Sequence, residues 1–169
     1  SDATETLSTM IKEYYNQGFD FLAMTDHGVT GKEWNKKQTQ LPLYLYQYLL
    51  GYTVTPLTDE EYYGITSGTY PLYDGTARGT GMTCVTGGNE LCNMTLTKSH
   101  VNGFFLPDGV GDGYGGYENG YKDAIAFVDK HGGLSHINHP GDWLDTNMDI
   151  NNVYNKEAID MFLRRVLCG

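Results

Sequence analysis

Hydrophobic residues recur along the chain at two spacings, one typical of helices and one typical of short buried strands. The helical spacing predicts helices over residues 7–15, 41–50, 121–131 and 157–167. Short apolar runs predict strands over residues 19–24, 82–85, 100–106 and 134–137. Gly18 and Gly132 follow two of the helices, where glycine is a common stop. Strands that alternate with helices favour a mainly parallel α/β architecture.

Gly and Tyr residues interrupt this pattern in the middle of the chain. They are concentrated between residues 44 and 121, where no internal repeat is visible. We expect an irregular excursion at about 51–81 and a Gly-rich loop at about 108–120. Loops on a rigid scaffold commonly carry specificity, so both segments are expected to shape a pocket. The length of 169 residues fits a single domain, 1–169, with these loops inside it.

Charge and composition exclude several classes of protein. The net charge is −10 and only 11 residues are Lys or Arg, which disfavours a nucleic-acid role based on a basic patch. No apolar run reaches the ~20 residues of a membrane span, and no signal peptide is visible. Cys84, Cys92 and Cys168 are odd in number and irregularly spaced, so we interpret them as buried thiols and expect a cytoplasmic protein. Nothing in the sequence indicates an oligomeric state.

Two of the predicted strands end abruptly in Asp or His. Asp26 and His27 follow the first strand, and His136 and His139 lie at the end of the last. Ligands bind at the carboxyl ends of parallel strands, and imidazole and carboxylate groups coordinate transition metals. The odd offset between His136 and His139 places them on opposite faces of a strand, which argues against one ion held by both. Pro140 keeps His139 extended, which favours His139 as the ligand.

Other patterns in the chain have structural interpretations. A G-x-G-x-x-G pattern is formed by Gly111, Gly113 and Gly116. It lacks the acidic residue that a dinucleotide site needs after the next strand. Asp108 and Asp112 lack the spacing of a calcium loop, and we interpret the loop that contains them as solvated and flexible. His131 lies at a helix end, where it can bind the last carbonyl groups.

Five short motifs occur in an order that makes the chain resemble the PHP family, the polymerase and histidinol phosphatase domain. They are Ser1-Asp2, Thr25-Asp26-His27, Gly88-Asn89-Glu90-Leu91, His100 at the start of 101–106, and Asn138-His139-Pro140-Gly141. Members of this family are metal-dependent phosphoesterases with a distorted (β/α)7 TIM-like barrel. The resemblance runs over nearly the whole chain and implies this α/β fold and this activity.

The resemblance also implies a cluster of two or three divalent ions, Zn, Mn or Fe, at the strand ends. The implied metal ligands are Asp2, His27, Glu90, His100 and His139. Asp2 and His27 would share one ion. Glu90 would bridge two others, with His100 and His139 completing the second of these. Water bound to the metal would attack the phosphorus, so no side chain is assigned as catalytic. The substrate would be a small anionic molecule that contains a phosphate group.

Three further residues are expected around these ligands. Asp26 is expected to orient a ligand, because it adjoins His27. Asn89 and His136 are expected to contact substrate or to hold the loops that carry the ligands.

The chain departs from the family pattern at both ends. The family begins with a strand carrying His-x-His and ends with Asp-x-His on a late strand, and neither motif occurs here. We therefore expect an interior portion of the barrel, incomplete at both termini. Two alternatives stay open. One is amidohydrolase-like hydrolysis of a C–N or C–O bond by the same cluster. The other is a non-catalytic domain of this fold that binds a ligand or partner through residues 51–121.

Overall fold

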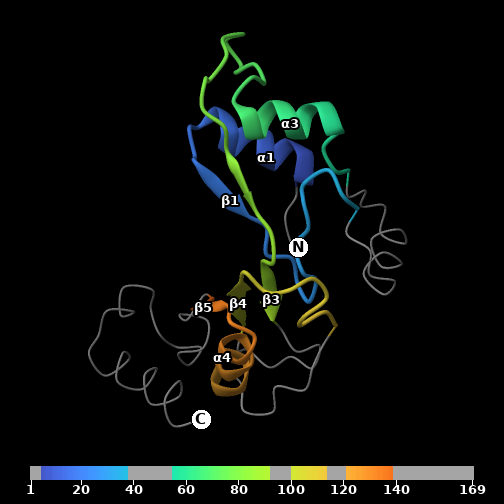
Figure 1. Cartoon of the computed structure of the whole chain (residues 1–169), viewed down its shortest axis with the longest axis vertical. Coiled ribbons are helices and arrows are strands. Elements are labelled where there is room, and N and C mark those ends of the chain that lie inside the picture. Colours follow the sequence, from blue (N-terminus) through green and yellow to red (C-terminus); the bar gives the residue numbers. More distant parts are fainter. Residues whose placement is uncertain (1–4, 38–54, 92–99, 114–120, 139–169) are drawn as a thin grey trace, which may run out of the picture. The chain divides into compact units, whose positions relative to one another are not determined.

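The computed structural model describes residues 5–37, 55–91, 100–113 and 121–138 (Figure 1). The chain divides into two compact units. Unit 1 consists of residues 1–24 and 31–86, and unit 2 consists of residues 25–30 and 87–169. The chain therefore leaves unit 1 for six residues, Thr25–Thr30, and returns to it before it enters unit 2 a second time.

Among its described residues, unit 1 has two helices and a small parallel sheet. The helices are α1 (Leu7–Asn16) and α3 (Asp59–Ser67), and the strands are β1 (Phe21–Ala23) and β2 (Thr83–Val85). The strands pair in parallel, with Leu22 opposite Cys84. The predicted first helix and the predicted strands at 19–24 and 82–85 are confirmed, with shorter strand bounds.

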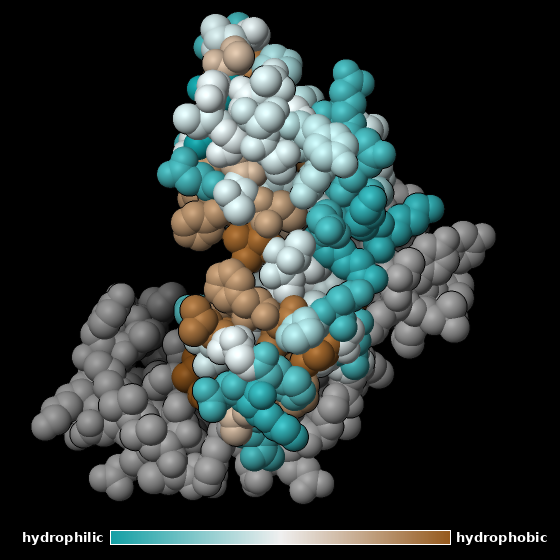
Figure 2. Space-filling view, viewed as in Figure 1, coloured by the Kyte–Doolittle hydropathy of each residue, from teal (hydrophilic) through white to brown (hydrophobic). Residues whose placement is uncertain are grey.

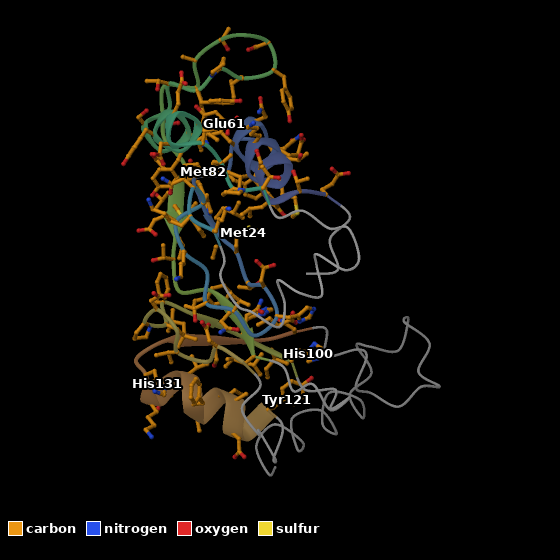
Figure 3. All side chains as sticks on the ribbon, turned by 90° about the vertical axis from the view of Figure 1, so that its right-hand side faces the viewer. Met24, Glu61, Met82, His100, Tyr121 and His131 are labelled. Atoms are coloured by element: carbon orange, nitrogen blue, oxygen red, sulfur yellow. The ribbon has the colours of Figure 1, made fainter. Side chains whose placement is uncertain are left out.

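The core of unit 1 is formed by residues of both helices and of the loops, and it packs against Leu22 of β1 and Cys84 of β2. Its fully buried members are Ile11, Tyr15, Trp34, Leu57, Ile65 and Met82. Met82, labelled in Figure 3, comes directly before β2. The helical spacing in α1 places Ile11 and Tyr15 on one face, four residues apart, and both are fully buried.

Helix α3 contradicts the prediction that residues 51–81 are irregular. Its start is a capping box, in which the Thr58 side chain accepts from the Glu61 backbone N–H and the Glu61 side chain accepts from the Thr58 backbone N–H. Its end is Gly68, which has a φ of 81°. A Cβ at Gly68 would lie 2.5 Å from the Thr80 carbonyl carbon, so a larger residue does not fit there. The capping signals decide the structure of this segment, and its Gly and Tyr content does not.

In the part of unit 2 that the structure describes, a helix packs against an antiparallel sheet. The strands are β3 (Asn89–Leu91), β4 (Val101–Phe104) and β5 (Leu134–Ile137), in the order β3-β4-β5, and helix α4 (Tyr121–Lys130) packs against β4 and β5. The predicted mainly parallel pairing is therefore wrong for this sheet. Alternation of strands and helices does not fix strand direction. The direction of each strand depends on the end of the sheet at which the connection before it returns.

The two faces of this sheet differ in polarity. The buried core contains Leu91, Val101, Leu106, Tyr121, Ala124 and Val128. Gly103 lets α4 approach the sheet, because a Cβ there would lie only 3.1 Å from Val128 Cγ2 of the helix. Residues that alternate with Leu91 and Val101, such as Glu90 and Asn102, face the other side. The outward surface of α4, which carries the exposed residues Asp129 and Lys130, is hydrophilic (Figure 2).

His131 follows α4, at the opposite end from Tyr121 (Figure 3). Its Nδ1 lies 2.8 Å from the Phe127 carbonyl oxygen, and because that oxygen only accepts, Nδ1 carries the proton. The predicted contact between His131 and the last carbonyl groups of the helix is confirmed.

The described residues form a mixed α/β structure with two small sheets. The closed (β/α)7 barrel and the single-domain organisation stay predictions. The predicted helices at 41–50 and 157–167 lie outside the described residues, as do Asp2 and His139. Within the part of the chain that the structure describes, no helix is long and apolar enough to cross a membrane.

Candidate metal centre

Backbone hydrogen bonds place His27 beside β3. The Glu90 N–H donates to the Asp26 carbonyl oxygen at 3.0 Å, and the Gly28 N–H donates to the Glu90 carbonyl oxygen at 2.8 Å. His27 and Glu90 thus form an isolated parallel bridge. The segment Thr25–Thr30 extends the edge of the sheet by one short pairing, and this pairing brings the His27 side chain next to Glu90.

The antiparallel ladder places His100 on the same side as Glu90. Glu90 pairs with Asn102 of β4, and His100, which is labelled in Figure 3, comes two residues before Asn102. Residues two apart on a strand share a face, so His100, Asn102 and Glu90 face the same side. The Asn138 N–H donates to the His100 carbonyl oxygen at 2.9 Å, which continues the β4–β5 pairing to His100.

The three side chains form a compact cluster. His27 Nδ1 lies 2.6 Å from Glu90 Oε2, and His100 Nδ1 lies 3.4 Å from Glu90 Oε1. One potential ligand atom from each residue lies within 4.8 Å of the other two. The side chains are 24%, 12% and 23% exposed for His27, Glu90 and His100. The cluster is therefore partly buried and still accessible from solvent.

The surroundings of Glu90 determine its charge. Burial raises the pKa of its carboxyl group, but hydrogen bonds from His27 and Asn138 and the nearby imidazoles lower it more, to about 2. The carboxylate is consequently ionised at neutral pH. An ionised carboxylate in a partly buried position is a strong attractor for a cation.

The donor set fits a transition-metal ion. Two imidazoles and one carboxylate suit Zn, Mn or Fe, because imidazole favours transition metals and carboxylate suits harder ions such as Mn. Each imidazole faces a different oxygen of Glu90, which is the arrangement that a bridging carboxylate needs. His27, Glu90 and His100 were predicted as ligands from three separate motifs, and the structure brings them together. Asp2 and His139, the other predicted ligands, lie outside the described residues.

Asp26, Asn89 and His136 occupy different positions around this cluster. The Asp26 carbonyl oxygen accepts the Glu90 N–H, so its backbone holds β3 in place, while its predicted role in orienting a ligand stays a prediction. Asn89 is fully buried on the face of β3 opposite Glu90, and its amide has no hydrogen-bond partner among the residues described. His136 pairs with Asn102 and faces the side of Glu90.

Thr30 and Asp112 hold the His27 segment, a role that was not predicted from the sequence. Asp112 Oδ1 accepts from the Thr30 N–H and from the Thr30 hydroxyl group, both at 2.6 Å. Thr30 is only 1% exposed. The Gly113 N–H donates to the Gly28 carbonyl oxygen at 2.9 Å. The prediction of a solvated loop is therefore wrong for Asp112, whose carboxylate binds a distant buried turn that local sequence patterns do not reveal.

Asn138 is a second residue of the site that was not predicted from the sequence. Its Nδ2 donates to Glu90 Oε1 and to Asn102 Oδ1, each at 2.7 Å. The signal in the sequence is its spacing of two from His136, which places both on one face of the strand. That signal becomes useful only when the antiparallel pairing with β4 is known.

Comparisons with models of protein families, with curated proteins and with solved structures gave no match for this chain.

Proposed function

We propose that this chain acts as a metal-dependent hydrolase, a phosphoesterase of the PHP type. The observation that supports it best is that the side chains of His27, Glu90 and His100 lie close together. These residues come from three motifs that each resemble a metal-ligand motif of that family. Their imidazole and carboxylate groups lie close enough to share an ion, and all three side chains are partly buried.

Each residue has a defined part in this proposal. His27 and His100 would supply imidazole nitrogens to the ion, and Glu90 would supply a carboxylate, whose pKa is about 2. These groups would hold a divalent ion, and the chemistry it would supply is activation of water and neutralisation of the phosphate oxygens. The partial burial of Glu90 strengthens its attraction for the ion, since fewer water molecules screen the charge.

The substrate class follows from charge. The chain has a net charge of −10, which disfavours long nucleic acids bound through a basic surface. A small phosphate ester needs positive charge only at the site itself, and bound divalent ions provide it there. We therefore propose a small phosphate-containing substrate.

Metal analysis and an aryl phosphate assay test this proposal. The purified protein should bind at least one Zn, Mn or Fe ion per chain, and it should hydrolyse an aryl phosphate in a way that a chelator abolishes. His27→Ala and Glu90→Gln should each remove this activity. His131→Ala is the matched control, because His131 contacts only its own helix among the interactions described for it.

Two results would contradict the proposal. One is the absence of any bound ion after supplementation with all three metals. The other is chelator-sensitive hydrolysis that persists in both His27→Ala and Glu90→Gln.

A further inference from the structure

Asn138 lies directly opposite His100, at the end of β5. Its backbone N–H donates to the His100 carbonyl oxygen at 2.9 Å. The register pairs Val101 with Ile137, so the next pair outward is His100 with Asn138. Alternation then places the Asn138 side chain on the face that carries Glu90 and Asn102. This position is confirmed by the contacts that its amide group makes.

The amide of Asn138 uses both of its N–H bonds. Nδ2 lies 2.7 Å from Glu90 Oε1 and 2.7 Å from Asn102 Oδ1. The ionised carboxylate of Glu90 can only accept, which fixes the nitrogen of the Asn138 amide on this side. The Asn138 Oδ1 therefore points the other way, where His136 Nδ1 lies 3.2 Å from it. The amide thus links His136 to Glu90.

This contact differs from those that the imidazoles make with Glu90. His27 Nδ1 and His100 Nδ1 face the carboxylate oxygens. An imidazole nitrogen that binds an ion has no proton left to donate to Glu90. The amide nitrogen of Asn138 binds no cation, since it carries two protons and only donates. Its hydrogen bond to Oε1 can therefore persist when the histidines bind an ion.

We propose that Asn138 is a positioning residue for the metal centre, acting through Glu90. Its N–H fixes one oxygen of the carboxylate, so that both oxygens are directed toward the imidazoles before an ion arrives. A free glutamate side chain has three rotatable bonds, and holding it in one orientation removes part of the entropy that metal binding would otherwise cost. This inference rests on the proposed function only in that it requires the metal centre, not hydrolysis.

Two substitutions at Asn138 test the role. Asn138→Leu keeps a similar size and removes both donors, and Asn138→Asp keeps the shape but places a second negative charge against Glu90. Both should weaken Zn and Mn binding by about 10–100-fold, the range typical of losing a hydrogen bond to a metal ligand. The affinity is measured by competition with a chromophoric chelator. The unfolding curve of the metal-free protein shows whether each variant folds.

A matched control exists in unit 1. Asn35 Nδ2 donates to Asp59 Oδ1 at 2.6 Å, so it also makes an amide–carboxylate hydrogen bond. Asn35→Leu should leave metal affinity as it is in the wild type. The visible spectrum of bound Co²⁺ is the second measurement. At saturating Co²⁺ it should change in both Asn138 variants and stay unchanged in Asn35→Leu, which a general loss of stability would not produce.

The outcomes separate this inference from the proposed function. If the wild type binds metal and both Asn138 variants bind it as tightly, with the same Co²⁺ spectrum, the positioning role is wrong and the metal centre stands. If the wild type binds no metal, the metal centre is wrong and the role of Asn138 with it. If the wild type and variants differ in affinity as expected while no phosphate ester is hydrolysed, the positioning role is supported and the phosphoesterase is not.

Discussion

Unit 1 and unit 2 use their polar side chains differently. In unit 1, several of these side chains satisfy backbone groups. The Thr58 and Glu61 side chains accept the free N–H groups at the start of α3, and Arg78 donates to the carbonyl oxygens of Gly18 and Phe19. In unit 2, polar side chains face one another, and Glu90 is held by His27 and Asn138. The Thr58 and Glu61 side chains complete the backbone of a helix, whereas the imidazole partner of Glu90 can exchange its contact with the carboxylate for an ion.

Bound metal should produce the largest difference between the units. A ligand that binds only the folded state stabilises it by about 2.7 kcal/mol at a concentration 100 times its Kd. We expect hydrogen exchange in β3 and β4 to slow accordingly on addition of Zn or Mn, because both strands carry or adjoin the ligands. Exchange in α1 and α3 should not change. If exchange in α1 and α3 slowed as much as in β3 and β4, the two units would open together, and the proposed difference between them would be wrong.

Thr30→Val should give the next largest effect, confined to unit 2. The substitution keeps the shape of the side chain and removes the hydroxyl that donates to Asp112. Losing a hydrogen bond between a buried hydroxyl and a carboxylate costs about 1–3 kcal/mol, and the His27 segment should loosen. Urea unfolding and metal affinity measure the two consequences. Thr66→Val is the control, because the Thr66 hydroxyl bonds only within α3. If Thr30→Val unfolds as the wild type does, Thr30 does not hold this segment.

Thr58→Ala should have a smaller effect, confined to unit 1. It removes one half of the capping box of α3, and such a change costs about 1 kcal/mol. Metal affinity should stay at the wild-type value, which a titration at a temperature well below unfolding would measure. A fall in metal affinity in Thr58→Ala would mean that the helix cap in unit 1 and the side chains around Glu90 in unit 2 are not independent.

The charge pair of Lys12 and Glu61 should give the smallest effect. The hydrogen bond from Lys12 lowers the pKa of Glu61 in the folded chain. A lowered carboxyl pKa adds stability above the unfolded value, which is about 4.5, and this stability is lost as the pH falls through the folded pKa. Glu61→Gln should therefore be less stable than the wild type at pH 6, by at most about 1 kcal/mol, and the difference should shrink toward pH 3. A difference that does not depend on pH would exclude the charge as its cause.

Local sequence patterns predicted the elements whose signals lie within the element itself. The helical spacing around Ile11 and the apolar run before His136 each gave an element with nearly the right bounds. Helix α3 was missed because its signals are at its ends, in Thr58 and Gly68, and its interior contains Tyr and Gly. The antiparallel sheet was missed because strand direction depends on connections that the periodicity of a strand does not encode.

Only those residues of the candidate site were predicted whose type is itself typical of metal ligands. His27, Glu90 and His100 have side chains that bind metals, and the structure brings all three together. Asn138 and Asp112 have side chains that are common on surfaces and in turns, so their residue type does not indicate a role in a site. Their roles depend on partners 48 and 82 residues away along the chain, and such partners are found only from the folded structure.

The excursion of Thr25–Thr30 into unit 2 has a consequence for dividing this protein into pieces. The chain crosses between the units after Met24, after Thr30 and after Thr86, so no single cut separates them. A polypeptide that begins at Gly87 would contain Glu90 and His100 but would lack His27. It would also leave the Glu90 N–H and carbonyl oxygen without Asp26 and Gly28 as partners, so β3 would become an exposed sheet edge.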